Sequence, residues 1–229
     1  MIALVAFGIL YSLLRVARPP HGATAATFDP TSVSLAGVQL AQIAAGVLGV
    51  LLITSEYASG LIRTTLAAVP RRLPALWGKA VVLAAAVVAV SGPAAVAVFL
   101  AGQSILGRQH LSVSLGAPGV VRAVIGSALY LAVAGLLGLA LGTLLRSTAG
   151  GIAALFGLLF AIPIVVGFLP GSLSDEIGKY LPGAAGLAVT TVHPDPATSL
   201  APWTGFGVFC AYTVVLLGFA AVRMRRGDA

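Results

Sequence analysis

The chain has 229 residues, of which 59% are hydrophobic and only 8% are charged, and its mean hydropathy is +1.07. Soluble domains carry about 25% charged residues, so this composition excludes an ordinary soluble protein and indicates a chain that lies in a bilayer. The formal charge of +7 does not indicate nucleic-acid binding, because the basic residues form no stripe with interleaved aromatic residues. Cys210 is the only cysteine, which excludes an intrachain disulfide and a cysteine-based metal cluster.

Long apolar runs predict an all-α, polytopic bundle of six transmembrane helices within a single membrane domain, residues 1–229. The predicted spans are approximately 1–17, 34–55, 79–103, 122–145, 149–169 and 203–222. At about 1.5 Å per residue, the uncharged residues 1–14 are too short for a hydrocarbon core of about 30 Å. We therefore expect the first helix to be truncated at its N-terminus, with upstream residues missing.

Prolines and glycines interrupt several of these spans. Pro93 and Pro163 lie inside predicted helices, where a proline removes a backbone donor and favours a kink. Gly135, Gly138 and Gly142 favour close helix approach, which we interpret as packing and not as a particular dimer face. The longest loop, 170–202, carries charged residues, prolines and a short apolar piece.

Gln39 and Gln42 lie three residues apart in an uncharged span, on one helical face. Lipid exposure would be unfavourable there, so both are expected to face protein or a cavity. Interhelical hydrogen bonding is favoured over contact with a substrate, because such polar contacts are common in membrane helix packing.

A compact polar segment follows this span. At about 100° per residue, Glu56, Gly60 and Arg63 share one face, which predicts a short amphipathic helix over 56–70. Ser55 fits its N-cap, and Pro70 fits its end. An interfacial helix that lies on the membrane, with its basic residues among the headgroups, explains the pattern equally well.

The residue order of this segment also resembles that of a known family. The order Glu-Tyr-x-x-Gly-x-Ile-Arg-Thr-Thr-Leu-x-Ala-x-Pro-Arg-Arg, between two apolar helices, is similar to that of the permease subunits of ABC-2 type ABC transporters. In that family the segment is the coupling helix that docks on the ATPase subunit. The resemblance assigns that contact to Glu56, Tyr57, Gly60, Ile62, Arg63, Thr64, Thr65, Arg71 and Arg72.

The resemblance implies partners and a location as well. It implies a homodimer, or a heterodimer with a second permease, in the cell (plasma) membrane, energised by separate ABC ATPase subunits that hold ATP and Mg. Export is the usual direction in the family, and the loop 170–202 would be extracytoplasmic, where it could form a small helix packed on the bundle. The nearly charge-free spans favour a hydrophobic or amphiphilic substrate.

The sequence offers no catalytic machinery of its own. Gly178-Lys179 is followed by Tyr180 and lacks the preceding glycine of a P-loop, so no cofactor is expected on this chain. His21, His110 and His193 are single loop residues, which are interpreted as surface histidines and not as metal ligands. The chain is therefore predicted to be a transport subunit and not an enzyme.

Charge distribution predicts the orientation. If the polar segment is cytoplasmic, that side receives eight cations, Arg63, Arg71, Arg72, Lys79, Arg146, Arg223, Arg225 and Arg226. The other side receives five, Arg15, Arg18, Arg108, Arg122 and Lys179. The positive-inside rule favours this arrangement.

Two alternatives stay open. An ion-coupled secondary transporter commonly uses a midplane carboxylate, which the spans lack, or broken-helix carbonyls, for which Gly92-Pro93 is weak support. A non-transporting membrane scaffold or sensor is the other.

Overall fold

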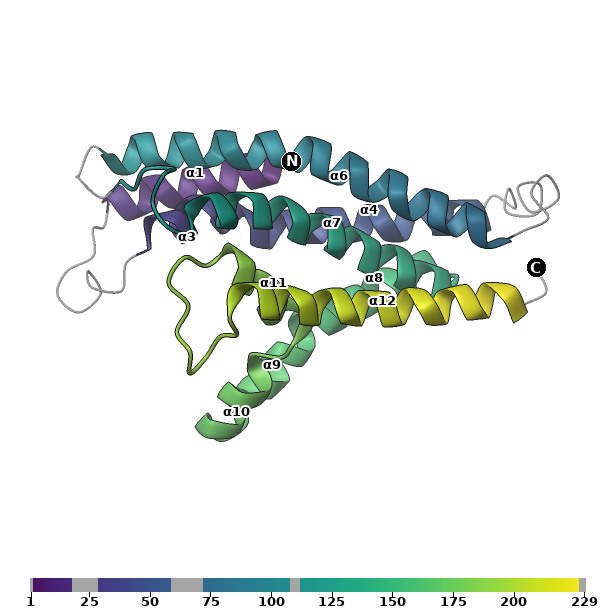
Figure 1. The fold of residues 1–229 in the computed structure, drawn as a ribbon. Coiled ribbons are helices and arrows are strands. Elements are labelled where there is room, and N and C mark those ends of the chain that lie inside the picture. The colour runs from purple at the N-terminus through teal and green to yellow at the C-terminus, as the bar shows by residue number, and fades with distance from the viewer. Residues whose placement is uncertain (1, 18–28, 59–71, 108–111, 227–229) are drawn as a thin grey trace.

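The computed structural model describes residues 2–17, 29–58, 72–107 and 112–226, and every regular element in these residues is helical (Figure 1). Within these described residues, five helices are long and apolar enough to cross a membrane. They are Pro30–Tyr57, Leu73–Leu106, Val120–Leu145, Thr148–Gly167 and Pro202–Arg225. The chain is therefore an all-α, multi-pass membrane protein. The expected first span is the shorter helix α1, Ile2–Ala17, which packs beside α6 and covers only part of its length (Figure 1).

The second span starts earlier than its apolar core. Asp29 caps α3, Pro30–Ser34, by accepting a hydrogen bond from the Thr31 backbone amide at 2.9 Å. Pro30 fits the first turn, where its missing N–H is not needed. The short 3₁₀ turn η1, Leu35–Gly37, then leads into α4, Val38–Ala58.

The end of α4 corrects one prediction. Residues 56–58 belong to α4, so Ser55 is not the N-cap of a separate helix that begins at Glu56. Serine and glutamate are compatible with a helix interior, and a polar segment alone does not break a helix that lacks glycine or proline at that point. The remainder of the predicted 56–70 helix lies outside the described residues.

Helix α6, Arg72–Leu106, begins before the predicted start at residue 79 and is 35 residues long. Pro93 lies inside it without ending it. Figure 1 shows the helix bending between its two halves. A proline that removes one i to i−4 hydrogen bond explains such a bend, as expected from the sequence.

Helix α7, Val120–Leu145, is the central element, and 78% of its most apolar window is buried against other helices. Its closest neighbour is α4. A Cβ at Gly138 would overlap the Gly46 carbonyl, and a Cβ at Gly49 would overlap the Gly135 carbonyl. The glycines therefore serve packing inside one chain.

The span Thr148–Gly167, which we call the arm, departs from the bundle in its second half (Figure 1). It comprises α8, Thr148–Phe156, the π-helical segment η3, Gly157–Ala161, and α9, Ile162–Gly167, and it leads into α10, Gly171–Gly178. Figure 1 shows α9 and α10 diverging from the other helices. Pro163 cannot donate to the Leu159 carbonyl four residues earlier, which accounts for a disturbed helix at this point.

The chain then returns to the bundle. Helix α11, Pro182–Leu187, and the 3₁₀ turn η4, Ala188–Thr190, pack against α12 and α7. The loop predicted over 170–202 thus contains a buried helical segment. Helix α12, Pro202–Arg226, completes the fold.

Candidate functional site: the polar end of the bundle

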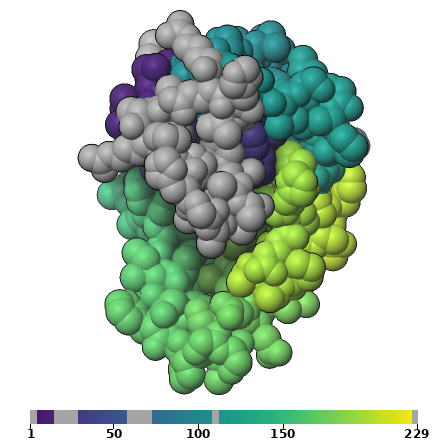
Figure 2. All heavy atoms as spheres, turned by 90° about the vertical axis from the view of Figure 1, so that its left-hand side faces the viewer, coloured from purple at the N-terminus to yellow at the C-terminus, as the bar shows by residue number. Residues whose placement is uncertain are grey.

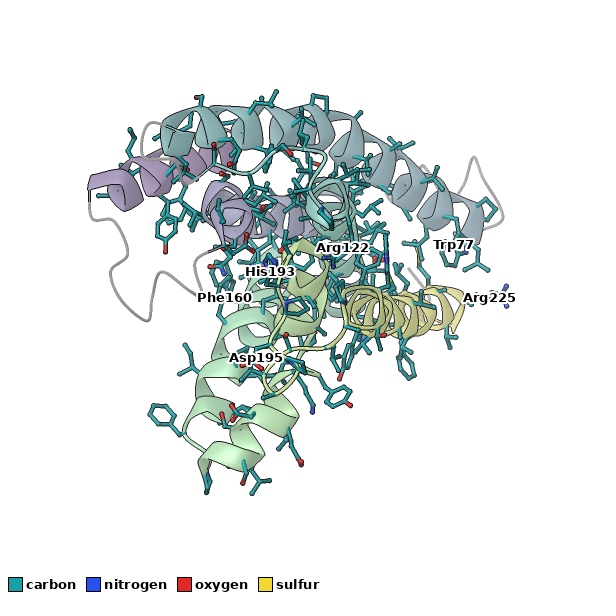
Figure 3. The ribbon with its side chains drawn as sticks, turned by 60° about the vertical axis from the view of Figure 1, so that its left-hand side comes forward. Trp77, Arg122, Phe160, His193, Asp195 and Arg225 are labelled. Atoms are coloured by element: carbon teal, nitrogen blue, oxygen red, sulfur yellow. The ribbon has the colours of Figure 1, made fainter. Side chains whose placement is uncertain are left out.

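One end of the bundle gathers polar side chains from four helices. We call it the polar end and define it as the C-terminus of α4, the first two turns of α6, the turn between α7 and α8, and the C-terminus of α12 (Figure 1, right). Figure 3 shows Trp77 and Arg225 at this end, whereas Arg122, His193 and Asp195 lie toward the other. The helices that flank residues 59–71 in the chain, α4 ending at Ala58 and α6 beginning at Arg72, both have these ends here.

The first contact joins α4 to α6. Lys79 donates to the Glu56 carboxylate in an ion pair whose side chains are 18% and 26% exposed. Such partly exposed pairs contribute about 0–1 kcal/mol to stability, so the pair matters more for position than for energy. It joins the two helices that flank the segment 59–71.

The second contact joins α4 to the turn after α7. The Arg146 guanidinium lies 5.6 Å from the centre of the Tyr57 ring, a distance typical of a cation–π contact. Arg223 of α12 is also near enough to act electrostatically on the Tyr57 phenol. Tyr57 is therefore the point where α4 contacts the end of α7, and the charge of Arg223 acts on it from α12.

Arg146 has an unusual backbone. Its φ is 51°, in the left-handed region, and its amide donates to the Gly142 carbonyl at 2.9 Å as the C-cap of α7. A non-glycine residue in this conformation is strained by about 1–3 kcal/mol. Its Nε is buried and has no hydrogen-bond partner among the described residues. The turn thus holds a strained arginine against Tyr57 at the polar end.

A third contact fixes the start of α8. The Thr148 hydroxyl donates to the Thr54 hydroxyl at 2.9 Å, and Ser147 caps α8 by accepting from the Gly150 amide at 3.3 Å. With the two preceding contacts, the last turn of α4 is joined to α6, α7 and α8.

The predicted contact residues are only partly described. Glu56 and Tyr57 lie at the polar end, in α4. The others, together with the side chain of Arg72, lie outside the described residues: Gly60, Ile62, Arg63, Thr64, Thr65 and Arg71. Sequence reasoning treated Lys79 and Arg146 only as topology signals and missed their contacts. The isolated acidic Glu56 could have prompted a search for a cation on the neighbouring helix.

The structure places the two glutamines in different surroundings. Gln42 is 4% exposed and accepts a hydrogen bond from the Tyr130 hydroxyl of α7, the interhelical bond that the sequence favoured. Gln39, by contrast, is exposed on the surface of the single chain, so its expected contact with protein or a cavity is not made within this chain and stays a prediction. Residues three apart are separated by about 60° around the helix axis, which is sufficient to place one on the packed side and the other at its edge.

Tyr130 also organises the apolar interior. Its ring centre lies 5.2 Å from that of Phe209 in α12, and Gly186 of α11 packs against both rings. A Cβ at Gly186 would lie 2.5 Å from the Tyr130 ring, so the close approach of α11 requires glycine. Four helices meet around this tyrosine.

Comparison with known proteins finds no matching family model, curated protein or solved structure.

Proposed function

We propose that this chain is the membrane-spanning permease subunit of an ATP-driven, ABC-2 type transporter in the plasma membrane, with ATP and Mg on a separate ATPase subunit. Its cargo is hydrophobic or amphiphilic and is exported, and two permease subunits form the working dimer. The observation that carries the proposal is the polar end, where the end of α4, which immediately precedes the ABC-2-like residues 59–71 in the chain, contacts α6 and the α7–α8 turn.

This arrangement suits the transmission of force. A partner that displaces the segment 59–71 also displaces the last turn of α4, because the two are covalently continuous. The Glu56–Lys79 pair and the Tyr57–Arg146 contact would pass that displacement to α6 and to the α7–α8 turn. Conformational coupling needs such a contiguous, packed route between the driven and the responding elements.

The first experiment substitutes Arg63, the central arginine of the segment. If Arg63 anchors a docked interface, Arg63→Ala removes about 2 kcal/mol, because arginine is a frequent hot spot whose partner would be left unpaired. ATPase association should then weaken about thirtyfold, with membrane insertion intact. Co-purification and transport in vesicles measure both effects.

Arg225→Ala is the matched control, because this arginine is exposed at the polar end but lies outside the segment. We expect it to bind the ATPase normally, and Arg71→Ala, beyond Pro70, to have a smaller defect than Arg63→Ala. Normal ATPase association and transport by the Arg63 variant at matched expression would reject docking through this residue. An interfacial helix would lose only about 1 kcal/mol of headgroup attraction.

A second experiment separates docking from transmission. Arg146→Gln removes the cation over Tyr57 and leaves the segment itself unchanged. We expect the variant to bind the ATPase subunit normally, to hydrolyse ATP and to transport less per ATP consumed. Transport driven by sodium or protons in liposomes without any ATPase would instead support a secondary transporter, and the absence of any transport or ATPase partner would support a scaffold.

A further inference from the structure

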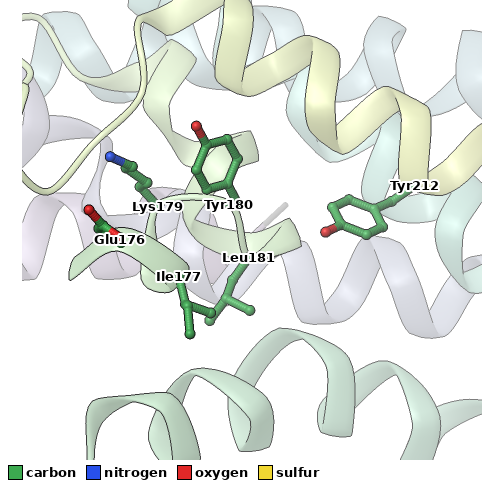
Figure 4. Close-up of a pocket in the computed structure, with 6 residues that line it drawn as sticks. All are labelled: Glu176, Ile177, Lys179, Tyr180, Leu181 and Tyr212. Atoms are coloured by element: carbon green, nitrogen blue, oxygen red, sulfur yellow. The ribbon is translucent and has the colours of Figure 1, made fainter. Parts of the chain in front are cut away.

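A cavity lies between α10, the turn that follows it, and α12, on the side where α9 and α10 diverge from the bundle. It has a volume of about 540 Å³, and its lining combines charged, phenolic and aliphatic groups (Figure 4): Glu176, Ile177, Lys179, Tyr180, Leu181 and Tyr212. Figure 2, which views the molecule from the end opposite the polar end, shows the surface hollowed between α10 and the segment before α12.

The charges in this cavity are available to a ligand. Glu176 and Lys179 lie three residues apart, and Figure 4 shows their charged groups on the same side of the cavity. Within the described part of the chain, neither is in an ion pair. The Lys179 ammonium lies 5.7 Å from the centre of the Tyr180 ring, which holds the cation near the cavity wall. One anionic and one cationic group therefore face the same space.

The depth of the cavity indicates an amphiphile. Helix α10 follows directly after the span Thr148–Gly167, where a membrane interface is expected, whereas Tyr212 lies ten residues into α12, about 15 Å along the helix. Ile177 and Leu181 supply apolar lining between these levels. The cavity thus extends from a charged rim to the apolar surface of a membrane helix.

The two opposite charges restrict the kind of headgroup that can bind in the cavity. A purely anionic headgroup would be attracted by Lys179 but repelled by Glu176, and a purely cationic one would meet the reverse. A headgroup with an ammonium and a phosphate satisfies both. A primary ammonium can donate three hydrogen bonds to Glu176 and the phenols, whereas a quaternary ammonium can donate none.

We propose that this cavity binds one zwitterionic phospholipid of the ethanolamine class. The ammonium lies at Glu176, the phosphate at Lys179, and an acyl chain follows Leu181 and Tyr212 along α12. This inference goes beyond the proposed transport function and does not depend on it, because binding requires neither an ATPase subunit nor turnover.

The test uses the purified full chain, delipidated in mild detergent and titrated with dioleoyl phosphatidylethanolamine, phosphatidylcholine or phosphatidylglycerol. Native mass spectrometry then counts the lipids that the protein retains. We expect one phosphatidylethanolamine retained, at an affinity about tenfold above that for the other two lipids. Equal retention of all three lipids would overturn the headgroup assignment.

Variants locate the site. Glu176→Gln and Lys179→Gln should each reduce phosphatidylethanolamine retention about tenfold, because each removes a charge-assisted contact. Asp175→Asn is the matched control, since it removes a neighbouring exposed carboxylate that does not line the cavity. Unchanged retention by both cavity variants would overturn the proposal, and so would an equal loss in the control.

A final experiment distinguishes a membrane lipid from a soluble compound with the same headgroup. Glycerophosphoethanolamine carries the same charged groups without acyl chains. We expect it not to displace the bound lipid at equal concentration, because it forgoes the apolar contacts at Leu181 and Tyr212. Displacement at equal concentration would overturn the lipid assignment in favour of a water-soluble ligand. Circular dichroism and melting of each variant verify that the fold is retained.

Discussion

Helix α7 and the α8–α9 arm have nearly the same mean hydropathy but differ in how much of each is buried in the molecule. Their mean hydropathies are 2.2 and 2.4, whereas 78% of the α7 window and only 17% of the arm window are buried. Hydropathy therefore identifies a membrane span without specifying its place in the bundle. That place depends on whether small residues on one helix match small residues on the next.

The glycines make this difference explicit. Gly135 and Gly138 of α7 approach the backbone of α4 at Gly49 and Gly46. In the arm, a Cβ added at Gly157 or Gly167 would meet no neighbouring atom within 4 Å, so these glycines serve no close contact inside the described chain. Only the start of the arm packs closely on the bundle, where a Cβ at Gly151 would lie 2.7 Å from the Val50 side chain, and Leu159, which is 5% exposed, packs close to Gly183 of α11.

The largest predicted difference in stability is between the alanine variants of two phenylalanines. Phe209 is completely buried beside Tyr130, whereas Phe168, near the end of the arm, is 85% exposed. Phe→Ala in a core lowers the free energy of unfolding by about 3–5 kcal/mol. We expect about 3 kcal/mol for Phe209→Ala, because lipid also surrounds the side chain with apolar groups when the helices separate, so that only the packing contacts are lost. Phe168→Ala should change stability by less than about 0.5 kcal/mol.

Reversible unfolding in mixed detergent micelles measures both variants. A large loss in Phe168→Ala would mean that the arm is packed against a second subunit in the purified protein. Phe168 would then lie in a subunit interface, and the comparison with Phe209 would be between an interface and a core.

The next contrast tests the glycines directly. Gly138→Ala places a methyl group against the Gly46 carbonyl, whereas Gly218→Ala in α12 meets no neighbour within 4 Å. Overpacking typically costs about 1–3 kcal/mol, and we expect about 2 for Gly138→Ala. Gly218→Ala should be neutral or stabilising by up to about 1 kcal/mol, because alanine is the better helix former. A Gly138 variant as stable as the parent would show that α4 and α7 can separate without loss.

The sequence predicts the spans better than their ends. Uncharged runs locate α7 and α12 closely, with α7 beginning at Val120 and α12 at Pro202, against predicted starts at residues 122 and 203. The continuation of α4 through Ser55 to Ala58 escapes a prediction from hydropathy, because the onset of polar residues marks where a span leaves the bilayer and not where its helix ends. Asp29 and Pro30 carry a recognisable start signal for α3, which hydropathy alone overlooks.

The interior of the bundle was harder to predict. Helix α11 is six residues long, so the short apolar piece of the loop allows a small helix packed on the bundle but has no periodic pattern to show where that helix packs. Its glycines are informative only once Tyr130 and Phe209 are known to lie beside them. Likewise, the polarity of Gln42 predicts that it needs a partner, but only the register of α4 against α7 identifies Tyr130. Long-range register is a property of packing and not of local sequence.

The smallest predicted effect concerns this buried hydrogen bond. Tyr130→Phe removes the donor and leaves the Gln42 carbonyl without it, whereas Gln42→Leu in the same chain removes the acceptor as well. Interhelical hydrogen bonds in membranes are worth about 0.6 kcal/mol on average and up to about 1.7, so we expect a coupling energy of about 1 kcal/mol in the double-mutant cycle. The double variant should be more stable than the two single losses combined, because no buried polar group is then left unpaired. Strict additivity would mean that a water molecule or another group replaces the lost partner, and that the centre of the bundle is less tightly closed than its packing around α7 indicates.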